Sequence, residues 1–218
     1  MANFDAQIQD LVGDSMTDNA AMNDWMTQGA REIINILPPE LLSKCTSRST
    51  LNDSALTLDL DGKGKVVYVT RLSADSNGYQ KACRQIPGLL GDISNDSDNM
   101  MYYATASDPV YWITNDSSGN PTLFVKPLPT ANQPAYVHHV TYPSITASDV
   151  SIIDNFPDEA EHLVVLYAAI KAAESLLASE EDIELFGTMV AGLKQDYDKG
   201  IQLLITKGVP PTPPPQGG

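Results

Sequence analysis

The segment from residue 163 to 177 constrains the fold most, because it is apolar around almost the whole circumference of a helix. Only Lys171, Glu174 and Ser175 interrupt it. A helix that is apolar on every side must be covered on every side, and one partner helix and one sheet rarely achieve this in a small domain. We therefore expect neighbouring subunits to supply part of the cover, through an interface formed by Leu163, Val164, Leu166, Tyr167, Ile170 and Leu177.

A second long helix is expected to follow and to end near residue 207. Its apolar residues recur every three or four positions, as on one face of a helix; they are Phe186, Met189, Val190, Leu193, Tyr197, Ile201, Leu204 and Ile205. The opposite face is charged and should lie partly in water. Residues 151–207 are thus predicted to form a helical hairpin, which opens at Pro157 because proline suits the first position of a helix.

The first fifty residues predict further helices that complete a helical bundle with this hairpin. Residues 4–12 place Phe4, Ile8 and Val12 on one side of a short helix. A longer helix should run to about Leu37, where two prolines end it by removing backbone N–H donors. Residues 1–50 are therefore assigned to the bundle.

Residues 51–150 change to the alternating pattern of β-strands and predict an inserted antiparallel β domain. Leu56, Leu58 and Leu60 alternate with polar residues, and residues 61–64 (DGKG) are typical of a hairpin turn. The expected return strand is 66–72. Further strands are expected at residues 79–86, 100–105, 110–114, 123–126 and 136–142, which are rich in β-branched and aromatic side chains. The fold class is thus α+β.

Residues 208–218 form a proline-rich segment that has no means of building a core. It should be an extended polyproline II tail, whose preset shape lowers the entropy cost of binding a partner. The tail residues expected to dock are Val209, Pro210, Pro211, Pro213, Pro214 and Pro215.

The residues predict neither catalysis nor a bound metal or cofactor. His138 and His139 are adjacent in a predicted strand and so point to opposite faces. Residues 59–63 (DLDGK) faintly resemble a calcium loop but lack its closing glutamate. Residues 95–99 (NDSDN) could offer oxygen ligands to a cation, although such polar loops usually face water. No nucleophile elbow or phosphate-binding loop is present.

The formal net charge of −15 limits the classes of partner. Such a surface repels phosphates, which disfavours both specific nucleic-acid binding and an anionic membrane surface. No apolar run has the length of a membrane-spanning helix, and the first residues lack the pattern of a signal peptide, so we expect the protein to be cytoplasmic when it is made. Cys45 and Cys83 are expected to be reduced.

Several short segments, taken in order, give the chain a resemblance to a known family. They are residues 25–35 (WMTQGAREIIN), 66–71 (VVYVTR), 83–87 (CRQIP), 103–105 (YAT), 109–111 (PVY), 137–143 (VHHVTYP) and 156–169 (FPDEAEHLVVLYAA). Together they resemble the tailed-phage head–tail adaptor (connector) proteins, in particular the group with a β insert between the helices.

The resemblance implies a non-enzymatic protein at the head–tail interface of a virion. It implies a ring of identical subunits, a dodecamer, that docks beneath the portal protein and contacts a neck, tail or nozzle protein below. The proline-rich tail would then dock on the portal. Double-stranded DNA would pass through the ring only as cargo, and the family has no catalytic residues to transfer.

Two other functions stay open at this point. One is another neck or tail structural protein, such as a stopper. The other, of a different class, is a small module that binds a glycan or a peptide through Tyr102, Tyr103, Tyr111 and Trp112, although their alternation places about half of them in a strand core.

Overall fold

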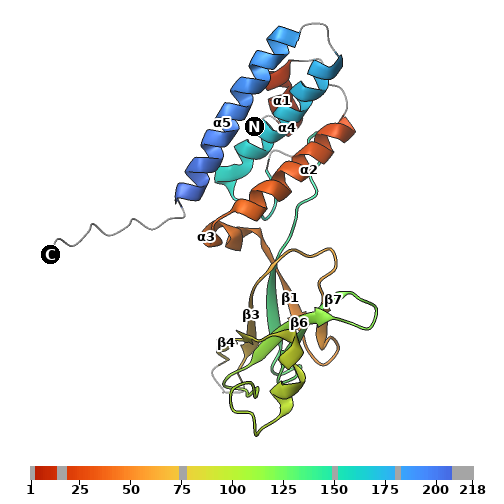
Figure 1. Ribbon diagram of the computed structural model, residues 1–218, viewed down its shortest axis with the longest axis vertical. Coiled ribbons are helices and arrows are strands. Elements are labelled where there is room, and N and C mark those ends of the chain that lie inside the picture. Colours follow the sequence, from red (N-terminus) through yellow and green to blue (C-terminus); the bar gives the residue numbers. More distant parts are fainter. Residues whose placement is uncertain (1–2, 14–18, 74–77, 149–151, 180–182, 208–218) are drawn as a thin grey trace, which may run out of the picture. The chain divides into compact units, whose positions relative to one another are not determined.

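The computed structural model describes residues 3–13, 19–73, 78–148, 152–179 and 183–207. The chain forms two compact units (Figure 1). Residues 1–45 and 142–218 make up the helical unit, and residues 46–141 make up the β unit. The α+β class is confirmed. The sequence suggested boundaries at residues 50 and 150, whereas the structure divides the chain after residues 45 and 141. The first boundary is earlier because an unpredicted strand begins at Thr46, and the second because the last strand ends at Val140. The predicted proline-rich tail lies outside the described residues.

The helical unit contains a C-terminal helical hairpin, as predicted. Its helices are α1 (Phe4–Val12), α2 (Asn19–Ile36), α3 (Pro39–Leu42), α4 (Asp158–Ser179) and α5 (Ile183–Lys207), and a 3-10 turn, η1, spans Ser43–Cys45. Asn3 caps α1, because its side-chain oxygen accepts the N–H of Ala6 at 3.0 Å. The two prolines separate α2 from α3, and Pro39 occupies the start of α3.

Helix α4 is the centre of this unit, and three helices of the same chain pack against it: α1, α2 and α5. The side chains of Leu163, Val164 and Ala168 are completely buried as a result. The same chain therefore supplies much of the cover that α4 needs, because three helices pack on it where one helix and one sheet were expected. Cover of the rest of α4 by a neighbouring subunit stays a prediction.

Two glycines allow the close packing around α4. A Cβ atom at Gly29 of α2 would lie 2.8 Å from Cδ1 of Tyr167, and a Cβ at Gly200 of α5 would collide with Leu163. Both glycines lie within helices, so neither is needed for an unusual backbone conformation. Each is needed because a side chain there would keep the neighbouring helix from packing closely.

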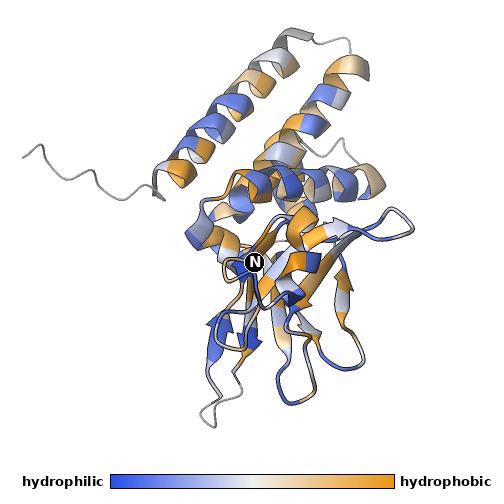
Figure 2. Cartoon of the chain, turned by 60° about the horizontal axis from the view of Figure 1, so that its bottom comes forward, coloured by the Kyte–Doolittle hydropathy of each residue, from blue (hydrophilic) through white to orange (hydrophobic). Residues whose placement is uncertain are grey.

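The β unit consists of two four-stranded sheets. Their strands are β1 (Thr46–Leu51), β2 (Thr57–Asp59), β3 (Val66–Leu72), β4 (Gln80–Ala82), β5 (Arg84–Gln85), β6 (Val110–Asn115), β7 (Pro121–Lys126) and β8 (Ala135–Val140). One sheet has the order β1-β8-β3-β4 and the other β2-β7-β6-β5. All pairs are antiparallel except β5 with β6, which is parallel. Some of the strands are mainly apolar, whereas others are polar, as are many of the connecting loops (Figure 2).

Several details of the predicted β domain are wrong. Strands β2 and β3 do not form a hairpin, because β2 pairs with β7 and β3 pairs with β8 and β4. Instead of the strand expected at residues 100–105, residues 100–102 form a turn and residues 103–105 are irregular. The strand expected at residues 79–86 is divided into β4 and β5. The antiparallel pattern is broken at β5, and β1 was not predicted.

The sheet β2-β7-β6-β5 has a different apolar cluster on each face. Tyr111 and Ile113 of β6 face the core between the two sheets, where they meet residues of β1, β3 and β8. Val110 and Trp112 point to the opposite face, as alternation along a strand requires. Residues 86–104, which include the 3-10 turns η2 (Gly88–Leu90) and η3 (Asp92–Asn95), cover that second face through Ile86, Tyr102 and Ala104.

Candidate assembly surfaces

The histidines that could suggest a metal site have structural roles. His139 is buried, and its Nε2 lies 3.0 Å from the hydroxyl oxygen of Ser49. The His138 ring stacks on Tyr68 with ring centres 4.2 Å apart. Burial, followed by the positive charge of Arg48, lowers the pKa of His138. No group of three His, Cys, Asp or Glu side chains within the described residues could hold a metal ion.

The two acidic loops are held as tight turns. An oxygen of the Asp59 carboxylate accepts the backbone N–H of Asp61 at 2.9 Å, and one of Asp96 accepts the N–H of Asp98 at 3.0 Å. Such bonds from a side chain to the backbone two residues later are typical of Asx turns. They account for the acidic residues at these positions without a bound cation.

Both cysteines are free thiols in buried positions. Burial raises the pKa of Cys45 to about 11 and that of Cys83 to about 12. A thiol with a raised pKa is a poor nucleophile at neutral pH, because the thiolate is the reactive form. The cysteines therefore contribute to packing.

The predicted aromatic binding surface does not exist as a continuous platform. Tyr111 and Trp112 are buried on opposite faces of their sheet, and Tyr102 is half-buried. Only Tyr103, at 36% exposure, offers much of its ring to solvent. This arrangement speaks against a glycan- or peptide-binding module built from these four residues.

Helices α4 and α5 form a groove that we call the tyrosine groove, with a volume of about 300 Å³; it is lined by Tyr167, Ile170, Lys171, Glu174, Lys194, Tyr197 and Asp198. The rings of Tyr167 and Tyr197 lie 6.1 Å apart, and the Tyr167 hydroxyl donates to Glu32 of α2 at 3.0 Å. Burial raises the pKa of Tyr197 to about 12. Burial and the bond to Glu32 also raise the pKa of Tyr167.

Glu174 joins the two helices at this groove. Its carboxylate accepts Lys194 of α5 at 2.8 Å and Lys171 of α4 at 3.1 Å. The pKa of Glu174 lies below its ordinary value of 4.5, mainly because of the hydrogen bond from Lys194. Burial alone would raise this pKa, but the contacts with Lys194 and Lys171 together outweigh burial. The carboxylate thus stays ionised to a lower pH than that of an ordinary glutamate.

Replacing Glu174 by glutamine is expected to lower stability only while the carboxylate is charged. A group whose pKa is lower in the folded state stabilises the fold above its unfolded pKa, and this contribution is lost as pH falls through the folded pKa. We expect a difference in unfolding free energy of at most about 1 kcal/mol near pH 7, since the pair is partly exposed. The difference should vanish below the lowered pKa. Urea unfolding of both proteins across the acid range measures this, and a constant difference would contradict it.

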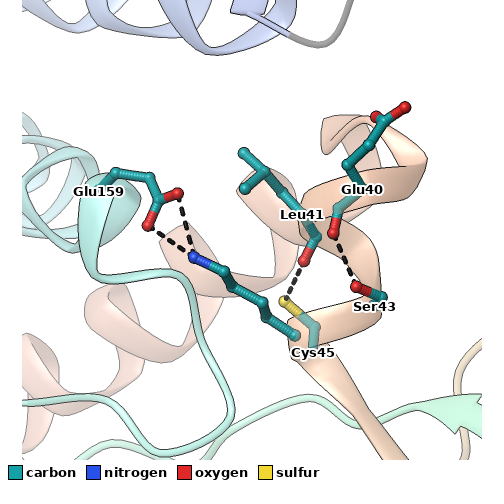
Figure 3. A network of polar contacts seen from close by, with 6 residues as sticks. Glu40, Leu41, Ser43, Cys45 and Glu159 are labelled. Carbon is teal, nitrogen blue, oxygen red and sulfur yellow. Dashed lines mark hydrogen bonds and ion pairs between the residues drawn. The ribbon is translucent and has the colours of Figure 1, made fainter.

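A second groove lies between α3 and the adjoining ends of α4 and α5. It has a volume of about 250 Å³ and is lined by Pro38, Glu40, Leu41, Glu159, His162, Gly200, Leu203 and Leu204. Lys44 fixes α3 to the start of α4 by donating to both carboxylate oxygens of Glu159 at 3.1 Å (Figure 3). The Ser43 hydroxyl donates to the Glu40 carbonyl at 2.7 Å and closes the turn.

The six predicted interface residues on α4 divide into two groups. Leu163, Val164 and Ile170 are buried inside the helical unit. Leu166, Tyr167 and Leu177 are half-buried and keep some surface for a neighbour. The sequence did not indicate that Glu32 bonds to Tyr167 or that Lys194 pairs with Glu174, since each is far in sequence from its partner on α4. The docking residues predicted between 209 and 215 lie outside the described part of the chain.

None of the helices in the described part of the chain is long and apolar enough to cross a membrane. A sequence model of one protein family, described as SU10 adaptor protein, matches residues 2–213. No curated protein sequence matches the chain. The family match extends over nearly the whole chain and agrees with the resemblance to phage head–tail adaptors, although it does not single out the group with a β insert. The chain therefore belongs to the SU10 adaptor protein family and is a structural adaptor of bacteriophage particles.

Proposed function

We propose that this protein is a head–tail adaptor subunit that forms a ring of identical copies, a dodecamer, on the portal protein. The ring joins the portal to a neck, tail or nozzle protein and forms part of the channel for DNA. The family match over residues 2–213 carries the proposal. The division into a helical unit and a β unit supports it, because each unit can present a different surface to a different partner.

The proposed contact between helical units of adjacent subunits uses the surface of α4 around the tyrosine groove. Leu166, Tyr167 and Leu177 are its contact residues, because they are only half-buried within one chain. The buried Leu163, Val164 and Ile170 hold α4 in position beneath them. The groove beside Tyr167 can accept side chains of a neighbour.

The charge of the chain suits a conduit for DNA. A subunit with a net charge of −15 gives a ring of identical copies a strongly negative surface. Phosphates are repelled by such a surface unless Lys and Arg displace their counterions. DNA is therefore a passing cargo and not a bound ligand.

Chemical cross-linking in the assembled particle separates an adaptor from a stopper. An adaptor ring yields cross-links between this chain and the portal protein. A stopper yields cross-links to neck or tail proteins and none to the portal. Purified protein mixed with purified portal should also form a ring-on-ring particle in electron micrographs.

Deletion of residues 209–218 is expected to weaken binding to the portal at least tenfold while the fold stays intact. A polyproline II segment binds at a low entropy cost, so its loss removes contacts that are efficient for their size. Biolayer interferometry with immobilised portal measures the affinity, and circular dichroism of the truncated chain reports the fold. Unchanged affinity would show that the tail does not dock on the portal.

A further inference from the structure

Residues 88–104 of the β unit expose large apolar side chains that no other described residue buries. Leu89 is 93% exposed, Met100 94% and Met101 70%. We call these three residues the apolar knob. An exposed apolar patch can mark a site of contact with another protein.

The segment that carries the knob is held firmly in place. The N–H of Ala104 donates to the Ser94 carbonyl at 3.0 Å, which closes the loop between them. Arg84 donates to the Met101 carbonyl at 3.1 Å and to Asp108 at 2.9 Å. Because its backbone is fixed, the knob can bind a partner without ordering a loose loop first. The segment occupies the yellow to yellow-green part of the β unit in Figure 1.

The same β unit also contains a groove. Its volume is about 390 Å³, and its apolar lining includes Leu60, Val66, Tyr111 and Ile113. Lys63 and Lys65 are the charged side chains that line it. We call it the lysine groove. Its size gives room for more than one apolar side chain.

The knob and the lysine groove are separate surfaces of the β unit. Residues 86–104 cover the face of β6 that carries Val110 and Trp112. The groove is lined by Tyr111 and Ile113, which alternate with them and point the other way. A subunit that carries a knob and a separate groove can bind a copy of itself head to tail. Such contacts close into rings when the rotation between copies allows it.

The charges of the two surfaces are complementary. Residues 88–104 contain Asp92, Asp96 and Asp98 and no lysine or arginine. No ion pair within the described ranges engages these carboxylates, or Lys63 and Lys65 of the groove. Attraction between them would favour the head-to-tail orientation over knob-to-knob contact, where like charges meet.

We infer that the apolar knob of one subunit docks in the lysine groove of the next, so that the β units form a continuous head-to-tail ring. The inference rests on the proposed ring and adds the surfaces that close it. It predicts a contact between unlike surfaces of identical chains.

The test uses two variants of the full chain that break opposite sides of the contact. The knob variant carries Leu89→Ser, Met100→Ser and Met101→Ser, and the groove variant carries Lys63→Glu and Lys65→Glu. Each alone should assemble at least tenfold more weakly than the unmodified chain. Mixed together, they should assemble more strongly than either variant alone, because the intact knob of one variant can pair with the intact groove of the other.

Native mass spectrometry of the free chain and of its complex with portal counts the subunits. Two control variants should assemble like the unmodified chain. One is Tyr79→Ser, which removes another exposed ring of the β unit. The other combines Lys63→Arg with Lys65→Arg and so keeps both positive charges. Circular dichroism confirms that every variant is folded.

Other outcomes would overturn the inference in distinguishable ways. Full assembly by both variants would disprove the knob-in-groove contact and leave the proposed ring intact. Variants that form rings but fail to bind the portal or a neck protein would assign the knob to that partner. If the unmodified chain formed no ring, alone or on the portal, the proposed function itself would fail.

Discussion

Replacing Leu163 by alanine is expected to lower the free energy of unfolding of the helical unit by about 3 kcal/mol. Leu163 is completely buried on α4, and Gly200 of α5 packs directly against it. The substitution removes buried methyl groups and leaves a cavity among helices that cannot close it fully. Because α1, α2 and α5 all pack on α4, the substitution should destabilise the whole helical unit.

Leu203→Ala provides the matched control for this change. Leu203 lies on α5 and is 65% exposed, so its truncation should alter the free energy by less than about 0.5 kcal/mol. Urea unfolding followed by the helical signal in circular dichroism measures both proteins. Equal losses would contradict the central position of α4 in the unit.

Replacing Gly91 by valine is expected to destabilise the β unit by about 3 kcal/mol. A Cβ atom at this position would lie 2.5 Å from Cε2 of Trp112 and 2.7 Å from its Nε1. The backbone of Gly91 is in the ordinary helical region, so the collision with the indole and not backbone strain sets the cost. Trp112 stacks on Phe124, with ring centres 5.6 Å apart, and so is hindered from moving away.

Trp112→Phe should relieve this collision, because phenylalanine lacks the indole atoms that the added side chain would meet. The double variant Gly91→Val with Trp112→Phe is therefore expected to lose less stability than the sum of the two single losses. Gly192→Val on α5 is the control, since nothing lies near that glycine. Simple additivity of the two changes would contradict the packing of residues 88–104 on the sheet.

The helices could be predicted from sequence because their signals are local. Apolar spacing placed α2, α4 and α5, and the two prolines after Leu37 marked the end of α2. The strands β3, β6, β7 and β8 were also found, since each is rich in β-branched or aromatic residues. Strand β1, with the polar sequence TSRSTL, gave no such signal and forms by pairing with β8 far along the chain.

Strand partners and surface roles could not be predicted, because they depend on residues distant in sequence. The DGKG turn indicated a hairpin, yet β2 pairs with β7 and β3 pairs with β8. Met100 and Met101 appeared strand-like because apolar residues there are followed by two tyrosines, but composition does not reveal that both methionines are exposed. The bond from Tyr167 to Glu32 spans 135 residues, and no local pattern signals it.

Electron microscopy of the native phage particle tests the central claim most directly, since it gives both the symmetry and the neighbours of this chain. The adaptor proposal predicts a ring of twelve copies in contact with the portal on one side and with a neck, tail or nozzle protein on the other. A particle in which this chain forms no ring, or in which its ring lies apart from the portal, would contradict it.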